Sequence, residues 1–274
     1  MIIAVDIGGT KTRISYSRIG NNLDDSLEFV TPKNQRVVIK TIQEKIKLLI
    51  GTSEVDAIGI SSPGPIDKKR GMILSPRNLS WNNLKIVKPL KDHFDCPVIL
   101  EHDATAGGIA EARAGSAKKY RVVLYISLST GIGSSIIFDG SPLPTAYNQE
   151  GGRQIIGSDP ALDRFGLSIG GKAIQQRFGK IAQDIHDPHI WQIIAQEFAL
   201  GIFNMITIIN PDCVVLGGGV SVHYRRFIRP LKKQLLSLGP IYPLPDIVKA
   251  RYAQTAPSLG VMFLAIEELK IANL

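Results

Sequence analysis

The stretch Asp6-Ile7-Gly8-Gly9-Thr10-Lys11-Thr12 separates a solid apolar run, residues 2–5, from an alternating run, residues 13–16. A strand buried on both faces reads as a continuous apolar run, so this order predicts strand, glycine turn, strand. Such a hairpin differs from the strand and helix that open a dinucleotide-binding unit. Glycines allow positive φ and close approach, so several N–H groups of the turn can point at one anion. We predict a phosphate-binding hairpin, with a plain polar hairpin as the alternative.

Other groups of this first turn also suit a phosphate ligand. The two threonines add hydroxyl donors, and Asp6 ends its strand where a carboxylate could hold a hydrated Mg²⁺. The residues predicted to bind phosphate here are Asp6, Gly8, Gly9, Thr10, Lys11 and Thr12.

The second half of the chain starts as the first does. An apolar run at 121–128 leads into Ser129-Thr130-Gly131-Ile132-Gly133, and another strand is expected at 134–138. Thr130 and Gly131 are predicted to bind phosphate, with a plain hairpin again as the alternative. Two such turns, one in each half, indicate a nucleotide clamped between two lobes.

A third glycine motif follows the buried strand predicted at 213–216. Gly217, Gly218 and Gly219 would leave a flat backbone surface on which an adenine or ribose can lie. The alternative is an ordinary connection from a strand to a helix.

Two segments carry candidate acid–base or sugar-binding groups. In Glu101-His102-Asp103, Asp103 precedes a small-residue helix predicted at 104–114, where it could accept a proton from a substrate hydroxyl. Aspartate is also a common helix cap, and the residues alone favour capping. In Glu150-Gly151-Gly152-Arg153, the charged pair could bind sugar hydroxyls, and a surface loop with an ion pair is the simpler reading.

Composition and charge limit the class of protein. The 274 residues are 44% hydrophobic and 20% charged, which is ordinary for a globular chain, and the net charge is +8. The surplus is interpreted as spread along the chain, which suits an anionic substrate better than nucleic acid. Two distant cysteines cannot build a disulfide framework, and neither a signal-peptide core nor a bilayer-length apolar run is recognised. We therefore expect a cytoplasmic protein without membrane or nucleic-acid partners.

The predicted domain boundary lies near residue 115. Residues 1–115 form the expected N-terminal lobe, completed by a C-terminal helix at 257–274, and residues 116–256 form the C-terminal lobe. Helical spacing of apolar residues predicts further helices at 38–50, 190–209 and 224–238.

These motifs, in this order, resemble the ROK family of sugar kinases within the actin-like ATPase superfamily. The resemblance also covers residues 61–67, 78–81, 211–220 and 256–260. It implies an α/β fold of two actin-like (ribonuclease H-like) lobes, each a mixed five-stranded sheet with flanking helices, and a cleft between them. It further implies ATP and Mg²⁺, and transfer of the γ-phosphoryl group to a hexose hydroxyl, most simply that of glucose.

The resemblance assigns roles to single residues. Asp103 matches the base that takes the proton from the sugar hydroxyl, and Glu150 matches a sugar-binding glutamate. Asp163 matches the position of a second sugar-binding glutamate of the family, with a shorter side chain. The sugar-binding residues so predicted are Asn78, His102, Asp103, Glu150, Arg153 and Asp163.

Departures from the family pattern affect the sugar and the metal. His102 replaces the usual asparagine, and Arg153 replaces a histidine that binds zinc in the family. Residues 154–170 contain no cysteine, so no structural zinc is expected. Buried polar groups discriminate strongly between substrates, so the sugar could instead be fructose, mannose or an N-acetylated amino sugar.

Other functions remain as alternatives. One is a catalytically weak protein that binds sugar or nucleotide, and another is a kinase with a donor other than ATP. A sugar-responsive repressor is disfavoured, because the first phosphate motif begins at Ile3 and leaves no room before it for a DNA-binding segment. The expected partners are a small-molecule sugar and ATP, and the resemblance makes a homodimer an option.

Overall fold

The computed structural model describes residues 1–76, 78–145, 147–159 and 164–272. The chain forms two compact units. Unit 1 comprises Met1–Ala110, Thr145–Asn148 and Thr255–Leu274, and unit 2 comprises Glu111–Pro144 and Gln149–Gln254. The first boundary falls five residues before the one expected from the sequence. Glu111 belongs with unit 2 because its carboxylate accepts the backbone N–H groups of Ser116, Arg251 and Tyr252.

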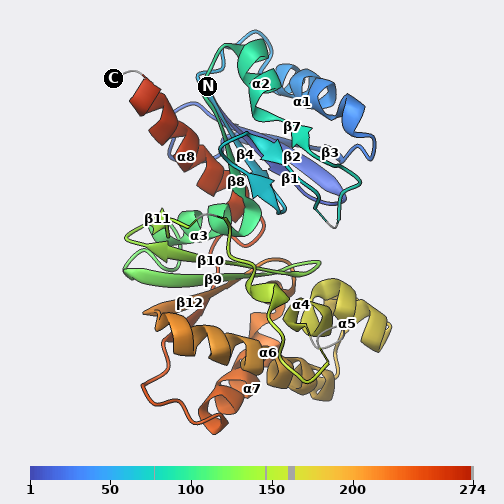
Figure 1. Ribbon diagram of the computed structural model, residues 1–274, viewed down its shortest axis with the longest axis vertical. Coiled ribbons are helices and arrows are strands. Elements are labelled where there is room, and N and C mark those ends of the chain that lie inside the picture. Colours follow the sequence, from blue (N-terminus) through green and yellow to red (C-terminus); the bar gives the residue numbers. More distant parts are fainter. Residues whose placement is uncertain (77, 146, 160–163, 273–274) are drawn as a thin grey trace. The chain divides into compact units, whose positions relative to one another are not determined.

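Unit 1 is built on a mixed five-stranded sheet in the order β3-β2-β1-β4-β8. Its first two strands form the antiparallel hairpin expected from the sequence, and β1, β4 and β8 are parallel. The strands are β1 (Ile2–Ile7), β2 (Lys11–Ser17), β3 (Asp25–Val30), β4 (Ala57–Ser62) and β8 (Val98–His102). Figure 1 shows α1 (Gln35–Ile50) and α2 (Val87–Phe94) on one side of this sheet and α8 (Ala256–Ala272) on the other.

A small second sheet in unit 1 carries one of the predicted site residues. It consists of β5 (Ile66–Asp67), β6 (Met72–Ile73) and β7 (Leu84–Lys85), which pair antiparallel in that order. Asn78 lies in the connection between β6 and β7, which Trp81 anchors by donating its indole N–H to the Pro32 carbonyl at 2.9 Å.

Unit 2 repeats the same plan. Its mixed sheet has the order β11-β10-β9-β12-β13, with an antiparallel hairpin of β9 and β10 and with β12 parallel to β9. The strands are β9 (Val122–Leu128), β10 (Ile132–Phe138), β11 (Ser141–Pro142), β12 (Cys213–Gly217) and β13 (Asp246–Lys249). Helices complete the unit: α4 (Phe165–Ile169), α5 (Gly171–Phe178), α6 (Pro188–Ile209) and α7 (Tyr224–Ser237). The expected fold class, with two mixed five-stranded sheets, is confirmed.

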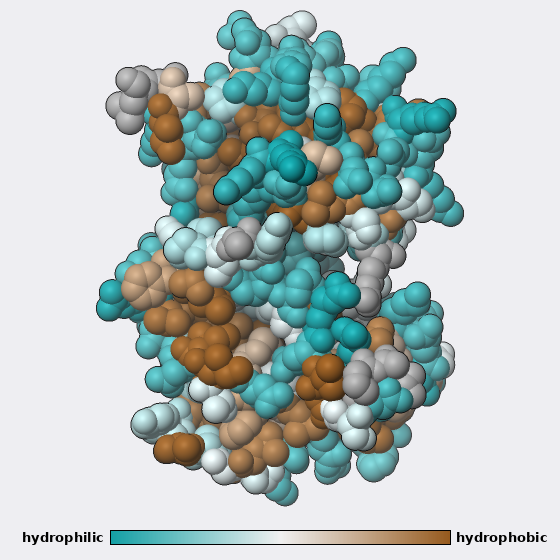
Figure 2. Space-filling model, viewed as in Figure 1, coloured by the Kyte–Doolittle hydropathy of each residue, from teal (hydrophilic) through white to brown (hydrophobic). Residues whose placement is uncertain are grey.

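One helix of unit 2 corrects the sequence-based reading of apolar runs. By length and composition α6 could cross a membrane. It is nevertheless a core helix, because Trp191, Phe198 and Ile202 are fully or almost fully buried in the hydrophobic core of unit 2. Figure 2 shows that hydrophobic side chains also reach the surface of unit 2. Phe138 and Leu143 are among its exposed apolar residues.

Helix α3 (Asp103–Arg113) packs against α8 through a glycine. A Cβ placed on Gly260 would lie 1.8 Å from the carbonyl oxygen of Ala106, which is backbone and cannot rotate away. We therefore expect Gly260→Ala to lower the free energy of unfolding by about 2 kcal/mol, as overpacking does. Urea unfolding followed by circular dichroism measures this change.

The control for that variant is Gly131→Ala, since a Cβ on Gly131 meets nothing within 4 Å. Equal stability of the two variants would contradict the close contact of α3 and α8.

Candidate active site

Three polar residues line up across the sheet of unit 1. Asp6 is the register partner of Ser61, and Ser61 is the register partner of Glu101. Because β1, β4 and β8 are parallel, their carboxyl ends meet at one edge of the sheet, where ligands of open α/β sheets bind. The Ser61 hydroxyl donates to Asp6 Oδ1 at 2.9 Å. From the sequence, Ser61 was assigned only to the segment 61–67, which resembles a sugar-side segment of the family, and was given no role of its own.

The Asp6 carboxyl group is perturbed by its surroundings. The pKa of Asp6 is raised to about 6, mainly by burial and also by the negative charge of Asp103, while the Ser61 hydrogen bond and Arg13 oppose the rise. Two carboxyl groups thus act on each other at this edge. A cation placed beside Asp6 would stabilise the charged carboxylate and so lower its pKa.

Asp103 is the first residue of α3, one position inside the helix rather than before it. Its Oδ1 accepts the backbone N–H of Ala104 at 2.7 Å, so the side chain supports the start of the helix as expected. The side chain is also 35% exposed, which leaves the carboxylate within reach of a ligand. Capping and proton acceptance are therefore compatible at this residue.

His102 lies beside the Asp103 carboxylate. Its Nε2 is 3.3 Å from Asp103 Oδ1, and the ring is almost completely buried. The Nδ1 atom has no hydrogen-bond partner within the described part of the chain. A buried ring nitrogen without a partner costs free energy.

Glu101 joins three segments of unit 1 at the same corner. Its buried carboxylate receives Lys68 Nζ at 2.6 Å from the turn between β5 and β6. The side-chain amide of Asn148 donates to the other oxygen at 3.1 Å. These contacts hold the corner of β8 and α3 that presents Asp103. Sequence reasoning quoted Glu101 without giving it a role, because its partners lie 33 and 47 residues away.

The first glycine turn is ordered by threonines. The Gly8 N–H donates to the Lys11 carbonyl at 2.9 Å, and the Thr31 hydroxyl donates to the Gly8 carbonyl at 2.8 Å. Thr12 is buried and its hydroxyl lies 3.0 Å from that of Thr31. Thr12 therefore stabilises the turn through Thr31. Lys11 is exposed, with its Nζ 3.5 Å from Glu28.

Asn78 lies directly against this turn. A Cβ on Gly9 would come within 2.9 Å of Asn78 Nδ2, so only glycine fits there without a shift. The first turn of unit 1 therefore lies close to Asn78, and the negative charge of Asp103 acts on Asp6, near the end of β1. Thr10 is exposed in the same turn.

In unit 2, the second turn meets two other glycine segments. Gly171 and Lys172 donate their N–H groups to the carbonyls of Ser129 and Thr130, at 2.7 and 3.1 Å. A Cβ on Gly218 would lie 2.4 Å from the Leu128 carbonyl oxygen, immediately before this turn. The predicted phosphate and adenosine motifs therefore lie side by side. The start of α5, which the sequence did not assign to the site, joins them.

The glycines of the adenosine motif have different surroundings. Gly217 has no room for a side chain because Tyr125 covers it, and Gly218 has a φ of +81°, which favours glycine. Gly219 faces open space. The first two shape the turn, and the third leaves its surface bare.

The Glu150 segment is fixed by its glycines. The Gly151 N–H donates to the Ser134 hydroxyl at 2.9 Å, and Gly152 packs against the Ile132 carbonyl. Glu150 and Arg153 are both exposed on this 3₁₀ turn in unit 2, and Asp163 lies outside the described residues.

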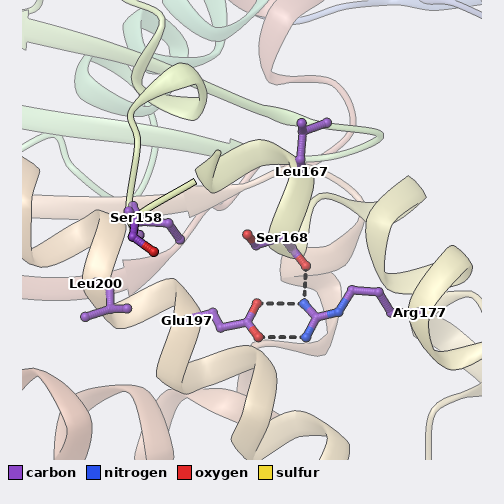
Figure 3. A pocket seen from close by; sticks show the side chains of 8 residues that line it. Ser158, Leu167, Ser168, Arg177, Glu197 and Leu200 are labelled. Atoms are coloured by element: carbon purple, nitrogen blue, oxygen red, sulfur yellow. Dashed lines mark hydrogen bonds and ion pairs between the residues drawn. The ribbon is translucent and has the colours of Figure 1, made fainter. Parts of the chain in front are cut away.

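A hollow in unit 2 contains none of the predicted site residues. Arg177 forms a two-pronged ion pair with Glu197 at its wall, at 2.6 and 2.7 Å, and also donates to the Ser168 carbonyl (Figure 3). The pair joins α5 to α6 and has a structural explanation.

The carboxylate of Asp6 is the candidate ligand for a metal ion. Mg²⁺ keeps most of its waters and is held by one or two carboxylates together with substrate phosphates. The half-buried Asp6 carboxylate, next to a turn suited to phosphates, fits that requirement. Within the described ranges, no group of three or more His, Cys, Asp or Glu side chains could enclose a metal ion.

Comparison with known proteins gives a consistent result. The model of the ROK family matches residues 2–146 and 158–268. The chain is 27% identical to a fructokinase of Lactococcus lactis subsp. cremoris, over 86% of this chain and 84% of the relative. It is also 27% identical to a fructokinase of Pediococcus pentosaceus, over 98% of this chain and 99% of the relative.

Among solved structures, a ROK family glucokinase from Streptomyces griseus, in complex with glucose and AMPPNP, has the same fold. It superposes with a TM-score of 0.85 at 22% identity, over 97% of this chain and 99% of that chain.

Proposed function

The chain belongs to the ROK family, and on that premise we propose that it phosphorylates a hexose hydroxyl with ATP as the donor and Asp103 as the base. One observation carries the proposal: an accessible carboxylate, Asp103, stands at the sheet edge where Asp6 and the first glycine turn also lie. Acid and phosphate-binding groups at one edge are the parts that phosphoryl transfer to an alcohol requires.

The proposed mechanism assigns a step to each group. Asp103 orients the attacking hydroxyl and accepts its proton. The N–H groups and hydroxyls of the two glycine turns bind the phosphates and offset charge on the transferring phosphoryl group. Mg²⁺, held through water by Asp6, would neutralise phosphate charge. Positioning and neutralisation supply most of the rate in such reactions, so Asp103 can act as an ordinary carboxylate.

The proposed sugar contacts are the residues predicted from the sequence. In unit 1 they include His102, whose ring lies beside the Asp103 carboxylate, and Asn78, which lies against Gly9. Glu150 and Arg153, exposed in unit 2, remain predicted sugar contacts, as does Asp163. A cytoplasmic location and a homodimer also remain predictions.

Fructose is the first sugar to test. Glucose is the simplest acceptor by sequence reasoning, but relatives named fructokinase match at 27% identity over most of the chain. The test measures sugar-dependent ADP formation with fructose, glucose, mannose and N-acetylmannosamine at equal concentrations. Turnover of at least one of them supports the proposal, and turnover of none at saturating ATP and Mg²⁺ would defeat it.

The nucleotide site gives a matched pair of glycine variants. We expect Gly218→Ala to raise the KM for ATP tenfold or more, because a side chain there is strained at a φ of +81° and meets the Leu128 carbonyl. Gly219→Ala adds the same methyl group in open space and should change the KM for ATP much less. Initial-rate kinetics with varied ATP check both, and an equal effect would exclude a special role for the Gly218 turn.

A further inference from the structure

Helix α7 and the loop after it carry a concentration of positive charge. Residues 213–245 contain five cations and no acid, so five of the eight net charges fall in this stretch. The sequence-based view of a spread surplus is therefore wrong for this region. The cations are Arg225, Arg226, Arg229, Lys232 and Lys233.

The helix separates these cations from its buried side. Phe227, Leu231 and Leu235 are buried in the core of unit 2. At about 100° per residue, the five cations cover an arc of about 120° on the opposite side. All five residues are exposed. Figure 1 shows α7 at the margin of unit 2, with α6 on its inner side.

These cations form no ion pair within 4 Å in the part of the chain that the structure describes. None of the five cations takes part in a recorded ion pair, and the one side chain with a partner, Arg226, donates to the Ile185 carbonyl. The nearest acid after α7, Asp246, accepts the Tyr120 hydroxyl. The positive field reaches His223, whose pKa is lowered by burial first and then by Arg226 and Lys249.

Large apolar side chains are also exposed on α7 and on the loop that follows it. Leu236 lies within the cationic arc, one turn beyond Lys232, and is 62% exposed. The loop that follows exposes Ile241 at 91% and Tyr242 at 70%. These three side chains fall within seven residues of the chain, and large exposed apolar groups that gather in one region often mark an interaction site.

The combination of clustered cations and exposed apolar side chains fits some partners better than others. A soluble polyanion would need the cations and leave the apolar groups unused, and a mixed protein surface would call for both signs of charge. Anionic lipid headgroups offer uniform negative charge above an apolar layer, which suits a basic face with apolar side chains beside it. The expectation of no membrane partner rested on bilayer-crossing segments and did not consider this kind of contact.

We propose that the outer face of α7, together with the loop at 238–245, docks the protein reversibly on anionic phospholipid membranes. The five cations supply the attraction, and Leu236, Ile241 and Tyr242 enter the headgroup region. Each cation near such a surface strengthens binding about fivefold. The inference is independent of the proposed kinase activity.

The experiment measures sedimentation of the full chain with vesicles. With equal parts of phosphatidylglycerol and phosphatidylcholine we expect the protein to pellet, whereas with phosphatidylcholine alone it should stay in solution. Raised salt should release it, because the attraction is electrostatic. Failure to pellet with the anionic vesicles at low salt would overturn the proposal.

Charge variants identify the surface. Arg225→Glu/Arg229→Glu/Lys232→Glu should lower the partition coefficient by more than about 100-fold. The control, Lys69→Glu/Lys91→Glu/Lys118→Glu, changes the net charge equally at scattered exposed sites and should retain most binding. Equal loss in both triples would show a nonspecific charge effect and overturn the proposal.

An apolar variant separates a membrane from a soluble polyanion and does not depend on the charge variants folding. Ile241→Ser/Tyr242→Ser leaves every charge in place and should weaken vesicle binding about tenfold, given the apolar area withdrawn from the headgroup region. Vesicle binding that the variant leaves unchanged would refute membrane docking. If inorganic polyphosphate also released the original protein and the variant from vesicles equally, the face would be assigned to a soluble polyanion.

Discussion

Replacing Asp103 with asparagine is expected to lower the rate of sugar phosphorylation by about three orders of magnitude. Asparagine has the same shape, and its amide oxygen can still accept the Ala104 N–H that Asp103 Oδ1 now accepts at 2.7 Å. It cannot take a proton from the attacking hydroxyl. The loss should therefore fall on kcat, with the KM for sugar changed far less. Steady-state kinetics and an unfolding curve measure the two effects.

The control for this variant is Asp92→Asn on α2. Asp92 is exposed and pairs with Lys88 at 2.8 Å, so the same chemical change occurs there away from the candidate site. Activity of Asp92→Asn should stay near that of the original protein. If Asp103→Asn retained full turnover, Asp103 would have only its capping role, and a catalytically weak binding protein would become the better description.

Asp6→Asn is expected to change activity and stability in opposite directions. Phosphorylation should fall at least about 100-fold, because the amide cannot hold a hydrated Mg²⁺ as a carboxylate does. The free energy of unfolding at pH 7.5 should rise by about 3 kcal/mol. The gain arises because Asp6 carries its charge in a poorly solvated position beside Asp103, which raises its pKa to about 6.

The sign of the stability effect follows from that pKa. An aspartate with a pKa near 3.8 in the unfolded chain and about 6 in the fold binds its proton more tightly when folded. Stability contributed by this group is therefore present below about pH 4 and lost as the pH rises through 6. The difference between the two proteins should be large at pH 7.5 and small at pH 4, which urea unfolding at both values checks. A destabilised Asp6→Asn at pH 7.5 would contradict this account, and Asp92→Asn again serves as control.

Local signals explain why the two hairpins could be predicted from the sequence. The buried runs at 2–5 and 122–128 and the glycines after them lie next to each other in the chain, so no distant contact is needed to recognise them. The same holds for α1, whose apolar residues recur at helical spacing and which ends at Gly51 with a φ of +63°.

Elements that depend on distant partners were not predicted. The edge strand β3 is mostly exposed and reads as a polar loop until it pairs with β2. The small sheet of β5 to β7 has strands of two residues, too short for any period. Glu101 acquires its role only when Lys68 and Asn148 meet it. The clustering of cations on one face of α7 can be recognised only when the buried face of the helix is known.

The most direct test of the central claim follows the phosphoryl group itself. The protein is incubated with ATP labelled at the γ-phosphate, Mg²⁺ and one hexose at a time, and the sugar fraction is examined for label. We predict labelled sugar phosphate with at least one hexose, and only a trace of it with Asp103→Asn. Label that appears solely as inorganic phosphate, or that remains on ATP with every hexose, would contradict the assignment of Asp103 and the two glycine turns to phosphoryl transfer.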